Sequence, residues 1–344
     1  MADNCGNSGK SRNSGKSRKR IAATLAGVAA LAVTSACSTT DTTAAPGSGS
    51  GSGPATGGAA VVVDAPATTS SAAVYLGARN GGFAKAGVTV QAHNHTSSDS
   101  PLVGLLGNGY PIVWDNAADY LLAVQKKLAV TVVGLSDLGG PGQLDVLAKA
   151  GSPIRSVRDL PGHSVAIPGT TSSCALTIPA QLRAAGLDPK SVKLVPVALT
   201  DEGSALQRGI VDAACAPEPF LSTIRKTVST RSVSDQFTGP LTDTLVGVYV
   251  TTTSYAQQHP DVIASFRKAL AAENAALNAD PDALRKAVPT FTRVDASLAS
   301  GMKLPGFATN VTDTAPLRKL AELMQQAGML TSTALPADVM AADR

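Results

Sequence analysis

The sequence predicts an α/β protein built as two lobes, each with a mostly parallel sheet flanked by helices. Two observations predict this class. Short β-branched strands alternate with helices, and the alternation runs twice along the chain before a helical tail. Of the 344 residues, 44% are hydrophobic and 16% are charged, which is the balance of a chain that buries a core. Parallel sheets connected in this way are covered by helices on both faces.

The first run of alternation covers residues 59–134. Apolar or β-branched segments bounded by turn residues predict strands over residues 59–64, 87–91, 112–114 and 130–134. The hydroxyl cluster at residues 68–71 offers an N-cap to a helix that runs through Leu76. A second helix is expected from Ser100 and Pro101, a cap followed by proline at the first helical position, and a third over about 117–127.

The second run predicts strands over residues 145–149, 164–167, 193–197 and 213–216. Helices are expected over about 171–185, with a kink or early end at Pro179, and over 203–208. The tail contains a strand over 245–250, an amphipathic helix over 261–277 and a last helix closed by Gly328. We expect this helical tail to pack back on the first lobe.

The first 36 residues have the pattern of a secretory signal peptide. A basic segment precedes an apolar run over residues 21–33, shorter than the ~20 residues of a membrane-spanning helix. Residues 33–37, Val-Thr-Ser-Ala-Cys, resemble a bacterial lipobox, in which Cys37 becomes the lipidated start of the mature chain. The alternative is an ordinary signal peptide with an incidental cysteine. Residues 37–58 are rich in Gly, Ser and Thr and predict a flexible tether at the outer membrane face.

Charge and motifs exclude several functional classes. Six of the 29 cations and one of the 25 anions precede residue 37, which leaves a nearly neutral body without an electrostatic hold on nucleic acid. The two Gly-Lys-Ser copies near the N-terminus lack the earlier glycine of a P-loop. The sequence contains no HExxH, GxSxG or GxGxxG motif, so we expect no catalytic residues and no cofactor. His93, His95 and Asp99 could hold a metal ion, but we expect a polar loop there.

The most informative stretch is residues 165–173. A strand passes through Pro-Gly into a hydroxyl cluster, and a helix follows; the cluster consists of Thr170, Thr171, Ser172 and Ser173. A helix N-terminus presents free N–H groups and a positive dipole end, which bind carboxylate, sulfonate, nitrate or phosphate without lysine or arginine. The alternative is that these hydroxyls only cap the helix.

Six passages in order resemble the substrate-binding proteins of ABC importers for taurine, alkanesulfonates and nitrate, relatives of thiamine-pyrimidine-precursor binders. They are residues 75–88 (G-x-F-x-x-x-G-hydrophobic after a helix), 156–166 (s-x-x-D-L-x-G-K-x-v-a, with His163 for the lysine), 184–189 (k-A-G-L-d-p), 207–214 (l-x-x-G-x-v-D-A), 216–220 (W-E-P-f without the tryptophan) and 259–262 (x-P-d-v). The resemblance spans about residues 59–340. Pro111 and Ala216 depart from the family where substrate is contacted.

The resemblance implies a periplasmic binding protein type II fold with a ligand cleft between lobe I, residues 59–140 and 245–344, and lobe II, residues 141–244. It implies a lipid-anchored, extracytoplasmic subunit that captures a small anionic or zwitterionic solute, such as a sulfonate, nitrate or organic acid. The expected partners are an ABC permease and its ATPase, with the chain itself a monomer. The alternatives are an enzyme related to thiamine-pyrimidine synthesis, or a binder of a pyrimidine, flavin or aromatic acid.

Ligands of open parallel sheets bind beyond the carboxyl ends of the strands. The expected ligand contacts are therefore Thr68, Thr69, Ser97, Ser98, Trp114, Asp115, Asn116, Thr170, Thr171, Ser172, Ser173 and Glu218. In taurine-type relatives the acid at the Glu218 position can meet a substrate ammonium, and the alternative is a hinge role. The resemblance also places Cys174 near Cys215, either bonded as a disulfide or as two buried free thiols.

Overall fold

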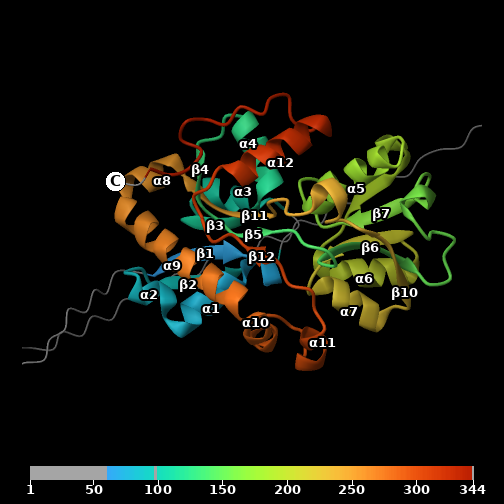
Figure 1. Ribbon diagram of the computed structural model, residues 1–344, viewed down its shortest axis with the longest axis horizontal. Helices are drawn as coiled ribbons and strands as arrows, with labels where there is room; N and C mark the ends of the chain where they lie inside the picture. The colour runs from blue at the N-terminus through green and yellow to red at the C-terminus, as the bar shows by residue number, and fades with distance from the viewer. Residues whose placement is uncertain (1–59, 97–98, 343–344) are drawn as a thin grey trace, which may run out of the picture. The chain divides into compact units, whose positions relative to one another are not determined.

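The computed structural model describes residues 60–96 and 99–342, which lie within one compact unit of the chain. Their strands form two five-stranded sheets and one two-stranded pairing. We call the sheet that contains the first strand, together with its helices, lobe I, and the other sheet with its helices lobe II (Figure 1). The expected signal peptide and tether, with Cys37, lie outside the described residues, as do Ser97 and Ser98.

The lobe I sheet has the strand order β2-β1-β3-β11-β4. Its strands are β1 (Val61–Ala65), β2 (Val90–Asn94), β3 (Ile112–Asn116), β4 (Val130–Leu135) and β11 (Gly247–Thr252). Strand β1 pairs in parallel with β2 and β3, whereas β11 runs antiparallel to β3 and β4. Because only β11 is reversed, the predicted mostly parallel sheet is confirmed for this lobe.

Helices cover both faces of the lobe I sheet. They are η1 (Thr69–Ser71), α1 (Ala72–Asn80), α2 (Gly82–Lys85), α3 (Pro101–Leu106), α4 (Ala117–Gln125), α8 (Thr253–Gln258), α9 (Pro260–Ala279), α10 (Pro281–Ala287), η5 (Val288–Thr290), α11 (Ala296–Ser300) and α12 (Ala315–Gln326). Along β3, Ile112 joins the core that includes α1 and α9, and Val113 joins the core that includes α4 and α12. As expected for the tail, α9 packs against α1 and α2, and α12 against α4.

The lobe II sheet has the strand order β10-β6-β9-β7-β8. Its elements are β6 (Leu144–Lys149), η2 (Val157–Asp159), β7 (Ser164–Ile167), α5 (Ser173–Ala184), η3 (Pro189–Ser191), β8 (Lys193–Pro196), α6 (Leu199–Arg208), β9 (Ala213–Pro217), α7 (Phe220–Thr227), β10 (Thr230–Asp235) and η4 (Gly239–Leu241). Strand β7 is parallel to β8 and β9, and β6 is antiparallel to β9 and β10. Along β7, Val165 packs in the core that includes α5, and Ala166 in the core that includes α6 and α7.

Two crossovers, residues 136–143 and 236–246, connect the lobes, and they run side by side. The Gly139 amide donates to the Thr244 carbonyl at 2.8 Å, and the Val246 amide donates to the Asp137 carbonyl at 2.9 Å. Strand β5 (Asp137–Leu138) lies in the first crossover and pairs with β12 (Gly306–Phe307) from the tail. The chain enters each lobe from the other through the reversed strand, β6 or β11, which explains why each sheet contains one antiparallel member.

Some elements differ from the sequence-based expectation. Strand β2 occupies Val90–Asn94 instead of 87–91, and helix α6 begins four residues early, at Leu199. Pro179 lies inside α5 without ending it. A proline costs an interior helical hydrogen bond, but Ile178 and Leu182 are buried against the sheet and hold the helix in place.

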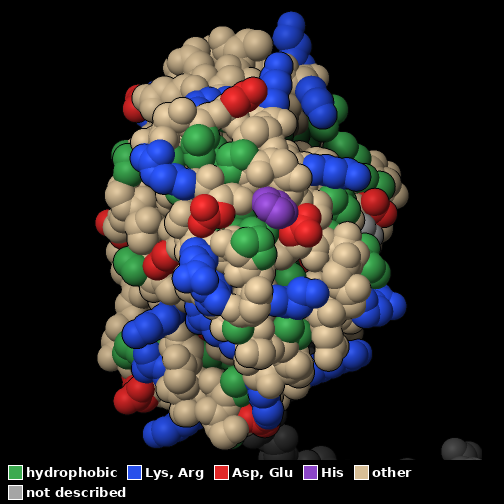
Figure 2. Space-filling view, turned by 90° about the vertical axis from the view of Figure 1, so that its right-hand side faces the viewer, with side chains coloured by type: hydrophobic (Ala, Val, Ile, Leu, Met, Phe, Trp, Pro, Cys, Tyr) green, Lys and Arg blue, Asp and Glu red, His purple; other side chains and the backbone are tan. Residues whose placement is uncertain are grey.

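The surface of lobe II carries both signs of charge. Figure 2 shows Lys and Arg side chains scattered over this end of the molecule, with acidic side chains between them, as on a solvated surface. In the part of the chain that the structure describes, no helix is both long and apolar enough to cross a bilayer.

Candidate ligand-binding site

A cavity of about 140 Å³ lies where the carboxyl ends of strands from both lobes meet. It is lined by Pro66, Thr68, Thr69, Ser70, Trp114, Asn116, Asp137, Gln143, Leu144, Pro168, Ser172, Ser173, Cys174, Leu199, Pro217, Glu218, Phe237 and Val246. The volume is well below the ~300 Å³ at which pockets for drug-sized ligands begin. The cavity therefore suits a small solute.

Lobe I contributes Thr68 and Thr69 from the turn after β1, and Trp114 and Asn116 from the end of β3. The Trp114 indole N–H donates to the Ser136 hydroxyl at 3.1 Å. The ring lies on the backbone of Gly247, because a Cβ there would be only 2.4 Å from it. A glycine at the start of β11 is thus what permits the tryptophan to line the cavity.

Asn116 connects the two lobes across the cavity. Its side-chain oxygen accepts from the Ala118 amide at 3.0 Å and so caps α4, which fixes the direction of the amide group. Its side-chain nitrogen donates to the Ser173 hydroxyl of lobe II at 2.7 Å. This hydrogen bond holds the lobe edges together beside the cavity.

The N-terminus of α5 forms the lobe II wall. Ser172 is the N-cap: its hydroxyl accepts from the Ala175 amide at 3.4 Å and donates to the Gly169 carbonyl at 2.7 Å. The helix begins at Ser173, two residues later than expected, so Ser172 and Ser173 line the cavity. Thr170 is exposed and Thr171 is half-buried, and neither of these two expected contacts lines the cavity.

Asp115 is also not a cavity-lining residue. Successive side chains of a strand point to opposite faces, so Trp114 and Asn116 face the cavity and Asp115 faces α4. There burial, together with the nearby charge of Asp119, raises the pKa of Asp115 well above its ordinary value. The Asp119 carboxyl in turn accepts from the Ser100 hydroxyl. Asp115 therefore belongs to the packing of α3 and α4 on the sheet.

Glu218 lines the cavity from the end of β9, as expected, but its carboxylate is already bonded within lobe II. Oε1 accepts from the Ser222 hydroxyl at 2.7 Å and Oε2 from the Ser222 amide at 3.1 Å. The Glu218 amide donates to the Gln143 carbonyl of the first crossover at 3.0 Å. Burial raises the pKa of Glu218, and the bonds from Ser222 offset this only in part. Because its carboxylate and amide are bonded within the protein, Glu218 fits the alternative role in the hinge between the lobes better than the role of an ammonium-binding residue.

Cys174 and Cys215 form a disulfide with a Cα–Cα distance of 6.0 Å. Cys174 stands in the first turn of α5 and Cys215 in the middle of β9, and both are buried. The bond therefore ties the helix N-terminus that lines the cavity to the sheet beneath it.

Eleven lining residues were not among the expected contacts: Pro66, Ser70, Asp137, Gln143, Leu144, Pro168, Cys174, Leu199, Pro217, Phe237 and Val246. Five of them lie in the crossovers or at the start of β6, and their place depends on how the crossovers pair. Phe237 reaches the cavity because its ring rests on Gly139, where a Cβ would be 2.5 Å away. Burial raises the pKa of Asp137 to about 7, although hydrogen bonds with Ser70 and Ser136 oppose that shift.

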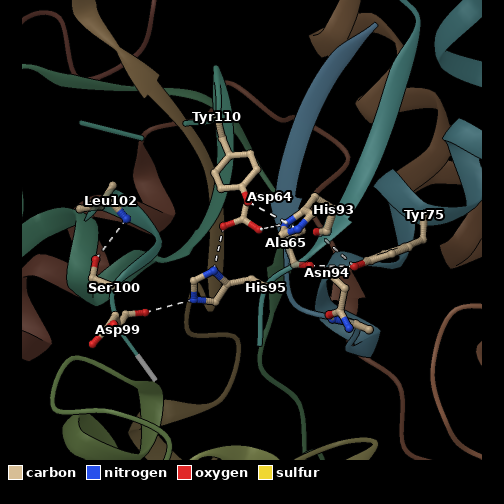
Figure 3. A network of polar contacts seen from close by, with 11 residues as sticks. Asp64, Ala65, Tyr75, His93, Asn94, His95, Asp99, Ser100, Leu102 and Tyr110 are labelled. Atoms are coloured by element: carbon tan, nitrogen blue, oxygen red, sulfur yellow. Dashed lines mark hydrogen bonds and ion pairs between the residues drawn. The ribbon is translucent and has the colours of Figure 1, made fainter. Parts of the chain in front are cut away.

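The two histidines considered as metal ligands instead share one carboxylate. Figure 3 shows Asp64 at the end of β1 between the rings of His93 and His95. Each ring Nδ1 lies 2.8 Å from an Asp64 oxygen. Burial alone would raise the pKa of Asp64, but these bonds lower it overall, and the same contact raises the pKa of His95. Among the described residues, no group of three or more His, Cys, Asp or Glu is arranged to hold a metal ion.

Comparison with known proteins relates this architecture to solute-binding proteins. The chain is 25% identical over 245 residues to the taurine-binding periplasmic protein of Escherichia coli K12, covering 70% of this chain and 74% of that protein. Its fold is similar to the alkanesulfonate-binding protein of Xanthomonas axonopodis pv. citri, with a TM-score of 0.69, 15% identity, and coverage of 82% of this chain and 98% of that one. The nitrate-binding protein of Synechocystis PCC 6803 has a TM-score of 0.62, 12% identity, and coverage of 79% and 82%.

These structures share the periplasmic binding protein fold, and the predicted two-lobe α/β class is confirmed. The family match rests on the sequence itself. The profile of the family described as NMT1/THI5 like matches residues 68–284, more than half of the chain and both lobes. The chain belongs to the NMT1/THI5-like family.

Proposed function

We propose that the protein is the extracytoplasmic solute-binding subunit of an ABC importer and delivers a small anionic or zwitterionic solute to a membrane permease. The observation that supports this most directly is the cavity between the lobes, which presents the N-terminus of α5 with Ser172 and Ser173. Backbone N–H groups and the helix dipole favour a sulfonate, nitrate or carboxylate group there. The names of the relatives, which are binding proteins, support binding rather than catalysis.

We assign ligand contact to the expected residues that line the cavity, with the exception of Glu218, and leave the others out. The assigned residues are Thr68, Thr69, Trp114, Asn116, Ser172 and Ser173. Glu218 also lines the cavity, but we give it the hinge role because both of its carboxylate oxygens are bonded to Ser222. We keep the lobe limits given above, at residues 140/141 and 244/245. They fall in the crossovers, so that each five-stranded sheet lies wholly on one side of them.

A thermal-shift screen of the chain from residue 59 onward tests the proposed function. It covers sulfonates, nitrate, small carboxylates, amino acids, pyrimidines and flavins. A ligand present at a hundredfold excess over its Kd stabilises the folded state by about 2.7 kcal/mol. Stabilisation by a small anion or zwitterion supports the proposal, and stabilisation by pyrimidines or flavins alone contradicts it.

Replacing Ser173 by alanine is expected to weaken solute binding by about three- to tenfold, because one hydrogen bond contributes ~0.5–1.5 kcal/mol. The change removes the bond from Asn116 that holds the lobe edges together, as well as a hydroxyl at the α5 N-terminus. Isothermal titration with a solute found by the screen measures it. The matched control is Ser204→Ala, an exposed serine of α6 outside the cavity. Equal affinities for Ser173→Ala and the wild type would remove Ser173 from the site.

The proposal includes a lipid anchor at Cys37 and a tether over residues 37–58, following a signal peptide over residues 1–36. Cys37→Ala is expected to move the protein from the membrane fraction to the soluble fraction of the producing bacterium. Fractionation with immunoblotting measures this, and the intact mass of the purified chain reports the lipid. The control is Cys5→Ala, which precedes the basic segment and would be removed with the signal peptide. An unmodified Cys37 in a chain that begins elsewhere would contradict the anchor.

A further inference from the structure

Asp137 lines the cavity, and one of its carboxyl oxygens has no hydrogen-bond partner among the described residues. Among the described residues that line it, two buried side-chain atoms have no hydrogen-bond partner, Thr68 Oγ1 and Asp137 Oδ1. A hydroxyl can serve as donor or acceptor, but an ionised carboxylate can only accept. Asp137 is 1% exposed, so its carboxyl is shielded from bulk solvent. A buried polar group without a hydrogen-bond partner destabilises the fold, and a bound ligand that donates to it removes that cost.

The backbone of Asp137 holds this carboxyl in one place. Its carbonyl accepts from the Val246 amide of the second crossover at 2.9 Å, and on the other side it pairs in β5 with Phe307 of β12. The next residue back, Ser136, accepts from Trp114 at 3.1 Å and donates to the Ser70 carbonyl at 2.6 Å. A group fixed between both crossovers is pre-organised, because binding requires little rearrangement of it.

The charge around the carboxyl is unbalanced. No lysine, arginine or histidine is among the described residues that line the cavity, whereas two carboxyl groups are, Asp137 and Glu218. The rest of the lining near the crossovers is largely apolar, with Leu144, Phe237 and Val246. Burial accordingly raises the pKa of Asp137 to about 7.

We propose that Asp137 is the specificity-determining residue of the site and binds a cationic nitrogen of the solute. This deepens the proposed function and rests on it. The solute class is then zwitterionic: its anionic end meets the N-terminus of α5, and its ammonium or amidinium end meets Asp137 Oδ1 in the crossover. A solute that carries only an anion would leave Asp137 unpaired and would bring a second negative charge toward it.

Asp137 fits this role better than Glu218. Both Glu218 oxygens are bonded to Ser222 of α7, so Glu218 completes its own lobe. Asp137 has an oxygen without a partner and belongs to the crossover, which contacts both lobes. A cation bound to Asp137 therefore contacts the crossover that connects the two lobes.

Matched pairs of solutes that differ by one amino group test the assignment: taurine with ethanesulfonate, 3-aminopropanesulfonate with propanesulfonate, and β-alanine with propionate. Affinities are measured by isothermal titration for the wild type and for Asp137→Asn, which keeps the shape and removes the charge. The wild type is expected to favour the amine-bearing member, and Asp137→Asn to reduce its affinity roughly 30-fold or more, as for a buried charge that loses its partner. The matched control is Glu202→Gln, another buried carboxyl with unpartnered oxygens but outside the cavity.

The outcomes separate this assignment from the proposed function. A preference for the amine that Asp137→Asn abolishes and Glu202→Gln retains supports it. Binding without a preference for the amine, or a preference that survives in Asp137→Asn, overturns the role of Asp137 and leaves the solute-binding function in place. Absence of binding by every amine-bearing member of the pairs overturns the role of Asp137, and the wider solute screen then decides the proposed function. Asp137→Ser replaces Asp137→Asn if circular dichroism shows that the asparagine variant does not fold.

Discussion

Replacing Cys174 and Cys215 together by alanine is expected to lower the free energy of unfolding by about 4 kcal/mol. The cysteines are 41 residues apart, and the bond between them restricts the unfolded chain, so that its loss returns the entropy of an open loop of that length. Both side chains are almost fully buried, so replacing them by alanine also removes packing contacts, and this lowers the free energy of unfolding slightly further. Urea denaturation of the purified chain from residue 59 onward measures the difference.

Two controls separate the covalent bond from packing. A reducing agent breaks the S–S bond of the wild-type chain but leaves both cysteine side chains in place. The free energy of unfolding of the reduced wild type should therefore fall to nearly that of the double variant. Cys174→Ala alone should lose as much as the pair, because either change opens the loop. A loss below about 1 kcal/mol in all three would show that the bond does not constrain the unfolded state as the loop length predicts.

The disulfide also bears on binding, because it ties the first turn of α5 to β9. Ser172 and Ser173, which stand next to Cys174 in the chain, form the cavity wall of lobe II. Loosening that turn spreads the directions of its N–H groups and weakens the hold on an anion. Stability and solute affinity are therefore expected to decrease together in the double variant.

The architecture could be predicted from the sequence because it depends on local signals. Apolar strand segments, the Ser100-Pro101 cap and the long amphipathic helix α9 are all encoded by neighbouring residues. Strand β10 could not be predicted, since Thr-Arg-Ser-Val-Ser-Asp contains one buried apolar side chain, Val233, and is held at the sheet edge by pairing with distant β6. The two-stranded pairing of β5 with β12 likewise joins segments about 170 residues apart in the chain.

The site divides in the same way. Thr68, Trp114, Asn116 and Ser173 follow from the rule that ligands gather beyond the ends of parallel strands. Asp137 and Phe237 do not, because a position in a crossover has no sequence period, and their neighbours are set by the pairing of the two crossovers. Asp115 shows the limit of the rule within a strand: the chain position is correct, but the alternation of β3 turns the side chain to the other face.

Glu202 is a buried acid for which the sequence offers no signal and the described residues offer no hydrogen-bond partner. It stands in the first turn of α6, is 0% exposed, and neither of its oxygens has a hydrogen bond. Burial raises its pKa well above the ordinary value of 4.5. The folded state therefore resists ionisation of Glu202, while the unfolded chain ionises it freely. Stability is fully present below pH 4.5 and decreases as the pH rises from there toward the pKa of the folded state.

Glu202→Met is expected to stabilise the protein by roughly 1–3 kcal/mol at pH 7, because a side chain of similar length that needs no partner replaces an unsatisfied one. The gain should shrink as the pH falls toward 4.5, where the charge is absent from both states and only the desolvation of a neutral carboxyl remains. Urea denaturation between pH 4 and pH 8 measures both features. Glu322→Met, an exposed glutamate of α12, is the control and should change stability by less than ~0.5 kcal/mol. A Glu202→Met variant less stable than the wild type at pH 7 would show that the carboxylate has a stabilising partner, since burial of an isolated acid cannot produce that sign.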